Sequence, residues 1–176
     1  HHPGAGAHHS AFQDQLVELR HFPIGARTAD GEKTVVILGD NIIEKSIKEE
    51  VREFVSQPKG ARILIKEVDR PERFGVVEFQ GERIARIAEK PVSPKTNYAV
   101  TGIYMYDAQV FDIIKTLKPS HRGELEITDV NNKYIEKGEL TFSKLEGWWT
   151  DAGTFESLLR ANNLAAEKAG KGKQED

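Results

Sequence analysis

Two apolar patterns follow each other between residues 34 and 68, and they limit the folds open to this chain. Thr34 to Leu38 is an unbroken, mostly β-branched run closed by Gly39, as is typical of a buried parallel strand. Apolar residues then recur at helical spacing, at Ile43, Ile47, Val51 and Phe54. Ile63 to Val68 restores strand character. Strand, crossover helix and strand normally form a right-handed parallel unit, so the sequence predicts an α/β fold.

The rest of the chain adds antiparallel strands and further helices. Residues 74–79 and 83–88 are β-rich runs separated by Gln80-Gly81-Glu82, which indicates a hairpin. Residues 99–106 predict another strand, and residues 125–137 a helix ended by Gly138. A last helix, capped by Thr154, carries the apolar residues Phe155, Leu158, Leu159 and Leu164. The predicted fold class is therefore α/β, a partial doubly wound mixed sheet with an antiparallel β insertion.

Composition narrows the classes of partner and compartment. The 25 basic and 28 acidic residues give a net charge of -3, and no basic block is interleaved with aromatics, which disfavours nucleic acid as a partner. No apolar stretch approaches the ~20 residues that span a bilayer, which disfavours a membrane. The chain has no cysteine, so neither a disulfide frame nor a thiolate metal site is available, and we expect a cytoplasmic protein.

We divide the chain into three parts. Residues 1–33 form a leader and an unmatched segment, residues 34–165 the functional domain, and residues 166–176 a flexible tail. Four histidines of the leader sit on a Gly/Pro/Ala background, namely His1, His2, His8 and His9. Closely spaced histidines can bind a metal, but without a scaffold to fix them a tag-like role is favoured.

Two aspartates stand where chemistry is expected. Asp40 follows the strand-end motif Leu38-Gly39, whose glycine lets a phosphate approach the backbone. Asp151 follows Trp148-Trp149 and precedes a turn of small residues. Both have a structural alternative, since an aspartate after a strand is often only the N-cap of the next helix. Two carboxylates from separate strand ends are also what Mg²⁺ needs when it keeps most positions for water and phosphate oxygens.

Between these aspartates lies an ordered series of motifs, which are FGVVEF, EKP, YAVTG and RGELEITD. With LGDN at residues 38–41 and WWTDAGT at residues 148–154, the series resembles the bacterial glucose-1-phosphate thymidylyltransferases, within the wider family of sugar-nucleotide pyrophosphorylases. The resemblance runs from about Val35 to Ala165 and implies a Rossmann-like nucleotidyltransferase fold. It also implies transfer of a nucleotidyl group between a nucleoside triphosphate and a sugar 1-phosphate, in nucleotide-sugar and polysaccharide biosynthesis.

The resemblance implies a role for each of eight positions. Asp40 and Asp151 correspond to Mg²⁺ ligands, and Glu89 to a residue that contacts sugar hydroxyls. Lys90 corresponds to a residue that binds the sugar phosphate and acts in catalysis together with Arg122. The remaining positions line the hexose, and they are Gly75, Val100 and Gly102. A solvated surface pair at Glu89-Lys90, and a simple ion pair of Arg122 with Glu124, stay open as alternatives.

The family's glycine-rich triphosphate loop has no counterpart in residues 1–33. We therefore expect this chain to be inactive alone, and to act as a homo-oligomer or with a complementing N-terminal half. Loss of that half should expose apolar faces of the 34–38 strand and its helix. Two other functions stay open, a noncatalytic sugar-phosphate sensor of the same fold and a metal-dependent glycosyltransferase. The second usually carries Asp-x-Asp, whose first aspartate the GDN segment lacks.

Overall fold

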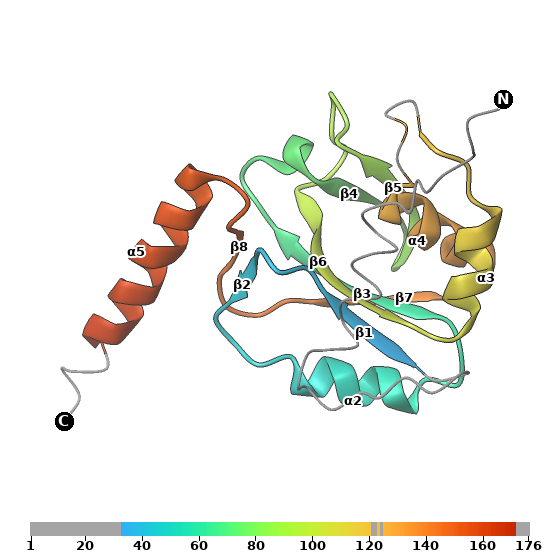
Figure 1. The fold of residues 1–176 in the computed structure, drawn as a ribbon, viewed down its shortest axis with the longest axis horizontal. Helices are drawn as coiled ribbons and strands as arrows, with labels where there is room; N and C mark the ends of the chain where they lie inside the picture. Colours follow the sequence, from blue (N-terminus) through green and yellow to red (C-terminus); the bar gives the residue numbers. More distant parts are fainter. Residues whose placement is uncertain (1–32, 121–122, 124, 172–176) are drawn as a thin grey trace, which may run out of the picture.

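The computed structural model describes residues 33–120, 123 and 125–171 (Figure 1). A six-stranded mixed sheet forms its centre, in the order β5-β4-β6-β3-β7, with β1 also paired to β6. Its strands are β1 (Thr34–Ile37), β3 (Ala61–Glu67), β4 (Gly75–Gln80), β5 (Arg83–Glu89), β6 (Tyr98–Tyr106) and β7 (Leu140–Lys144). Two short strands, β2 (Asn41–Ile43) and β8 (Trp149–Asp151), form a second antiparallel sheet. This architecture confirms the predicted mixed α/β fold.

Strand β6 organises the sheet, and all of its residues except Tyr98 are buried. Along one edge it pairs with β3. Along the other edge it pairs with two strands, with β1 through residues 103–106 and with β4 through Ala99. Residues 100–102 of β6 therefore lie between the end of β1 and the start of β4.

The parallel unit predicted between residues 34 and 68 is present, with a third strand inserted in it. Strand β1 was expected to run parallel to the strand after the helix, and its hydrogen-bonded partner among the described residues is β6, which runs antiparallel to it. Strand β3 is also antiparallel to β6, so β1 and β3 point the same way with β6 between them. An unbroken apolar run reports burial on both faces and does not report which strand lies alongside.

The segment after β1 also differs from the prediction. Ile43 was placed on a helix, whereas it ends β2 and pairs with Trp149 of β8. The helix α2 begins only at Lys48 and ends at Ser56. The helical spacing from Ile43 to Phe54 arises because Ile43, Ile47 and Val51 all pack on one cluster around Phe54 and Trp149, although they belong to different elements.

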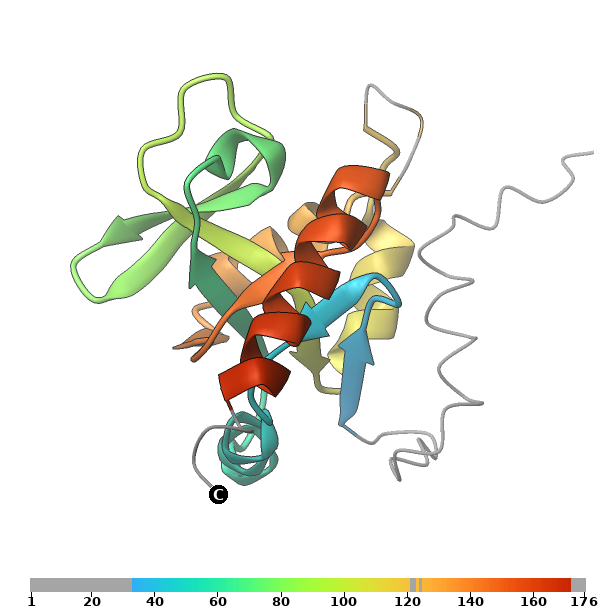
Figure 2. The same cartoon turned by 90° about the vertical axis from the view of Figure 1, so that its left-hand side faces the viewer.

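Helices cover both faces of the sheet (Figures 1 and 2). On one face, α3 (Gln109–Thr116) and α4 (Ile127–Glu136) pack on a cluster that includes Val36, Tyr104 and Tyr106. On the other, α2 packs through Phe54 on a cluster with Leu64 and Met105. The two clusters are separated by the alternation of side chains along β6, which sends Tyr104 and Tyr106 to one face and Met105 to the other.

The predicted hairpin is present as β4 and β5, joined at Gly81-Glu82. Gly81 has φ +62°, a left-handed conformation that a glycine adopts without the penalty of a Cβ. A 3₁₀ turn, η2 (Pro71–Arg73), leads from β3 into β4. The hairpin ends at Glu89, which faces Gly75 at the start of β4.

The last helix, α5 (Phe155–Lys171), extends away from the body of the molecule (Figure 1). Thr154 caps it as predicted, since its Oγ1 accepts from the Ser157 backbone N–H at 3.1 Å. Its apolar face is turned outward, with Phe155 94% and Leu159 61% exposed. The exposure expected for the first strand and its helix is not found at Val36 of β1, which is 1% exposed, but is found at Val55 of α2, which is 63% exposed. No helix in the described part of the chain is long and apolar enough to cross a membrane.

Asp107, just before α3, joins several elements through its carboxylate. It accepts hydrogen bonds from the Gly60 backbone N–H at 2.6 Å and from the Tyr134 hydroxyl at 2.9 Å. It also accepts from the backbone N–H of Gln109 at 3.1 Å. Partial burial of the carboxyl works to raise its pKa, but these hydrogen bonds outweigh that effect and hold the pKa below its usual value.

We expect Asp107→Asn to lower the free energy of unfolding by about 1.5–3 kcal/mol at pH 7, as for a lost charge-assisted hydrogen bond. A lowered pKa stabilises the fold above the unfolded-state value and loses that contribution as the pH falls through the folded value. The difference between the two proteins should therefore shrink towards pH 3. Urea unfolding at both pH values checks this, and an equal difference at both would contradict it.

Candidate functional site

The two predicted metal ligands lie next to each other at the end of β1. Asp40 follows β1 in the turn that leads into β2, and Asp151 ends β8, where it pairs with Asn41. The Asp40 carbonyl accepts from the Ala152 backbone N–H at 2.6 Å. An added Cβ at Gly153 would lie 3.2 Å from Asp40 Oδ2, so the turn after β8 passes directly over this carboxylate. The β2–β8 ladder thus joins residues more than one hundred positions apart.

The electrostatics of this pair favour a cation. The pKa of Asp151 is raised mainly by burial and further by the charge of Asp40, against the lowering influence of Arg73 and Arg160. A carboxylate whose ionisation is opposed by a neighbouring carboxylate is stabilised by a positive ion between the two. Oxygen donors suit Mg²⁺, which keeps several water or phosphate ligands. No group of three or more His, Asp or Glu side chains suited to a metal occurs in the described residues. A cation bound by this pair alone would therefore keep most of its coordination positions open.

Asn41 holds Asp40 in place. Its Nδ2 donates to Asp40 Oδ1 at 2.9 Å, while its Oδ1 accepts from the Gly102 backbone N–H at 2.9 Å. The same Oδ1 accepts from the indole N–H of Trp149 at 2.7 Å. Sequence reasoning quoted Asn41 within a motif and gave it no role, because its partners lie on β6 and β8.

The predicted sugar contact Glu89 ends β5 beside Gly75 and helix α4. Its Oε2 accepts from the Thr128 hydroxyl at 2.6 Å. An added Cβ at Gly75 would lie 3.3 Å from Thr128 Oγ1 and 3.5 Å from Glu89 Oε2. Thr128 is 5% exposed, so the hydroxyl that orients this carboxylate is itself fixed by burial. Glu89 Oε1, 3.9 Å from Lys90 Nζ, belongs to a partly exposed carboxylate that can meet a ligand.

Lys90 has an unusual backbone. Its φ of 42° is the only positive value among the non-glycine residues that the structure describes. The Lys90 backbone N–H donates to the Phe74 carbonyl at 3.0 Å, which ties this conformation to the start of β4. Non-glycine residues in such conformations gather at functional sites, where the surrounding structure holds them against the strain.

Lys90→Gly is expected to raise the free energy of unfolding by about 1 kcal/mol, because glycine removes the penalty of a Cβ in the left-handed region. Lys90→Ala removes the same charge and keeps the Cβ, so it should bring no such gain. Chemical unfolding of the three proteins measures the difference. Equal stabilities for the two variants would show that the Lys90 backbone is not strained.

The carboxylate pair and the Glu89 region meet along β6. Val100 and Gly102, both predicted to line a hexose, lie where β6 passes between β1 and β4. Leu38, at the end of β1, donates its backbone N–H to the Gly102 carbonyl at 2.9 Å. Val100 is 9% exposed and belongs to the core cluster that includes Val36, Tyr104 and Tyr106. A Cβ at Gly102 would lie 2.1 Å from Asn41 Nδ2, so glycine is required there for the Asn41 side chain.

The buried Tyr104 is affected by the charges of both groups. It is 5% exposed, and burial is the main cause of its raised pKa. The charges of Glu89 and Asp40 raise that pKa further. The charges of the predicted sugar contact and of the predicted metal ligand therefore both reach one buried hydroxyl. Sequence reasoning read Tyr104 as a strand residue only.

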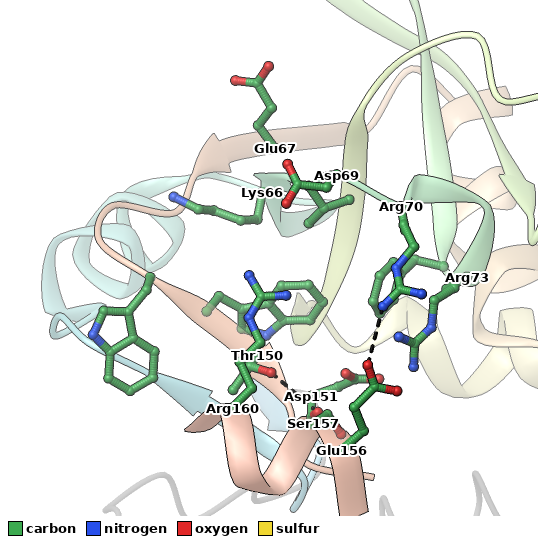
Figure 3. Close-up of a pocket in the computed structure, with 14 residues that line it drawn as sticks. Lys66, Glu67, Asp69, Arg70, Arg73, Thr150, Asp151, Glu156, Ser157 and Arg160 are labelled. Carbon is green, nitrogen blue, oxygen red and sulfur yellow. Dashed lines mark hydrogen bonds and ion pairs between the residues drawn. The ribbon is translucent and has the colours of Figure 1, made fainter. Parts of the chain in front are cut away.

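Asp151 also borders a pocket of about 390 Å³ between the segment after β3, β8 and the start of α5 (Figure 3). Four cationic side chains line it, namely Lys66, Arg70, Arg73 and Arg160. Four acidic ones line it as well, namely Glu67, Asp69, Asp151 and Glu156. Arg70 and Glu156 pair across it at 3.5 Å. The four positive and four negative side chains balance, so the lining does not favour an anion. Asp151 is the only predicted site residue that lines this pocket.

The structure thus brings together seven of the eight predicted site residues. Asp40 and Asp151 form one group, Glu89, Lys90 and Gly75 a second, and Val100 and Gly102 lie on β6 between them. Arg122 falls outside the described residues, as do the four leader histidines. Residues 1–32 are also outside, so the division at residue 33 stays a prediction.

Comparison with known proteins gives a consistent result. A family model described as nucleotidyl transferase matches residues 22–168. The glucose-1-phosphate thymidylyltransferase of Neisseria meningitidis is 44% identical over 144 residues, which cover 80% of this chain and 50% of that protein. The enzyme of the same name from Mycobacterium tuberculosis is 43% identical over 168 residues, 90% of this chain and 58% of that protein.

A solved structure agrees with these matches. A Bacillus anthracis protein described as a glucose-1-phosphate thymidylyltransferase, in complex with sucrose, is 58% identical with a TM-score of 0.73. The alignment covers 77% of this chain and 55% of that one. This chain therefore spans about half the length of the curated relatives that it matches.

Proposed function

Because the chain belongs to the nucleotidyl transferase family, whose model matches residues 22–168, we propose that it carries the sugar-phosphate-binding and metal-binding part of a glucose-1-phosphate thymidylyltransferase. The observation that carries the proposal is the arrangement of two groups beside β6: Asp40 lies under the turn that follows Asp151, and Glu89 accepts a hydrogen bond from the buried Thr128. The substrates would be glucose 1-phosphate and dTTP, and the products dTDP-glucose and pyrophosphate.

Each group has a defined task in this reaction. Glu89, oriented by Thr128, accepts hydrogen bonds from hexose hydroxyls, and the Lys90 ammonium offsets the charge of the sugar phosphate. Asp40 and Asp151 would hold Mg²⁺, which when bound stabilises charge on the phosphate oxygens. A phosphate oxygen of the sugar phosphate attacks the α-phosphorus of dTTP, and pyrophosphate leaves with the electron pair of the broken bond. Catalysis then rests on positioning and on electrostatic stabilisation.

Glu89→Ala is expected to weaken binding of glucose 1-phosphate by roughly 10–100-fold, as for the loss of charge-assisted hydrogen bonds worth about 1.5–3 kcal/mol. Isothermal titration of the chain with glucose 1-phosphate measures this in the absence of nucleotide. Glu82→Ala is the matched control, because Glu82 is exposed at the turn at the other end of the hairpin. Indistinguishable heats for the wild type and Glu89→Ala would show that the sugar site has been placed wrongly.

A further inference from the structure

The side chain of Asn41 is bound at both ends. Two N–H groups point at its Oδ1, the backbone N–H of Gly102 and the indole of Trp149. An amide nitrogen has no lone pair to offer to these donors, so the atom between them must be the oxygen. The amide NH₂ is thereby turned to Asp40, where Nδ2 donates to Oδ1 at 2.9 Å. The orientation of Asn41 is set by β6 and β8 and passed on to Asp40.

The Asn41 amide packs directly on the backbone of Gly102. An added Cβ at Gly102 would lie 2.1 Å from Asn41 Nδ2 and 2.7 Å from its Cγ. The amide therefore fills the space that any side chain at position 102 would occupy. Trp149 is fixed in turn, since it is 8% exposed and its ring lies 5.2 Å from that of Phe74. The donors that hold Asn41 are thus parts of the sheet and of the core.

We propose that Asn41 is a positioning residue for divalent cation binding, one that orients the Asp40 carboxylate toward Asp151. This inference rests on the proposed function, which makes Asp40 and Asp151 the cation ligands. Asn41 binds Oδ1 of Asp40, while Oδ2 lies on the side of the turn after β8, 3.2 Å from the Cβ position of Gly153. One carboxylate oxygen is held by the amide, and the other is presented to the neighbouring strand end.

A positioning role has a different consequence from a purely structural one. Asn41 also connects β2, β6 and β8, so its removal will lower stability in either case. Only the positioning role requires cation affinity to fall in a protein that remains folded. Partners that orient a metal ligand typically change metal affinity by about 10–100-fold when they are removed.

The test uses Mn²⁺ as a probe for the cation site, with free Mn²⁺ measured by electron paramagnetic resonance and Mg²⁺ added as a competitor. We expect Asp40→Asn to abolish the site and Asn41→Ala to weaken it about 10-fold or more. Trp149→Phe keeps an aromatic ring and removes one of the two donors to Asn41, so its affinity should fall by a smaller factor. Trp148→Phe changes the neighbouring tryptophan and should bind as the wild type does.

The outcomes separate this inference from the proposed function. If Asp40→Asn abolishes binding and a folded Asn41→Ala binds as tightly as the wild type, the inference is wrong and the cation site stands. If Asp40→Asn binds like the wild type, the cation site is wrong and the inference falls with it. Circular dichroism reports folding, and if Asn41→Ala does not fold, then Trp149→Phe decides by the same criterion, with unchanged affinity overturning the inference.

Discussion

Asp151→Asn is expected to lower magnesium-dependent pyrophosphate release by about 10²–10³-fold in an assembly that combines this chain with the part of a full-length relative that it does not match. The substitution keeps the shape of the side chain and removes one of the two adjacent carboxylates. Arg73 and Arg160, whose charges lower the pKa of Asp151, then remain beside a neutral amide. The local charge becomes less negative, and the site loses attraction for a cation.

Release of pyrophosphate from dTTP and glucose 1-phosphate measures the effect, with Mg²⁺ varied at each substrate concentration. Asp112→Asn is the matched control, since Asp112 is an exposed aspartate of α3 paired with Lys115 at 2.9 Å. Wild-type release by Asp151→Asn at limiting Mg²⁺ would show that the β2–β8 carboxylate pair takes no part in the reaction.

The sequence predicted the class of fold, and it placed most of the candidate site residues at strand ends, because the informative patterns were local. The hairpin of β4 and β5, the helix at α4 and the cap at Thr154 follow from turn residues, apolar spacing and capping chemistry. The positions of Asp40, Glu89 and Asp151 came from ordered motifs, each placed at the end of a strand. A strand end and its turn leave a short signature in neighbouring residues, so both can be read from one segment.

What the sequence did not show depends on distant partners. Residues 41–43 are a strand only because they pair with β8, and β1 is antiparallel to its neighbour because β6 inserts beside it. Asn41 gains its role through hydrogen-bond partners 61 and 108 positions away, and Thr128 through a partner 39 positions away. Tyr104 likewise gains its role from the distant residues Glu89 and Asp40. No local periodicity encodes such contacts, so these residues were missed.

The apolar face of α5 shows the same limit. The spacing of Phe155, Leu158 and Leu159 predicted a helix and gave no sign of which face would be covered. Among residues 155–167 of α5, Ser157 and Ala161 are the buried positions, and Phe155 is 94% exposed. Propensity fixes the helix, whereas the docking of its face requires a surface of matching shape.

The second large effect is the dependence of pyrophosphate release on a second protein part. We expect the chain alone to release no detectable pyrophosphate, because transfer requires both reactants to be held in line and positioning is worth ~7–11 kcal/mol of barrier. Addition of the unmatched part of a full-length relative, expressed separately, should restore release. Two features offer it a place to bind. Within the described residues β1 pairs with β6 alone, and α5 presents Phe155 and Leu159 to solvent.

This complementation is also the most direct test of the claim that the chain supplies the sugar-phosphate and carboxylate part of a nucleotidyltransferase site. Pyrophosphate release from dTTP and glucose 1-phosphate is measured with Mg²⁺ for the chain alone, for the added part alone and for the mixture. The account predicts release from the mixture only, lost again when the chain carries Glu89→Ala. Robust release by the chain alone, abolished by Asp151→Asn, would contradict it and show that residues 1–33 build a triphosphate site of their own.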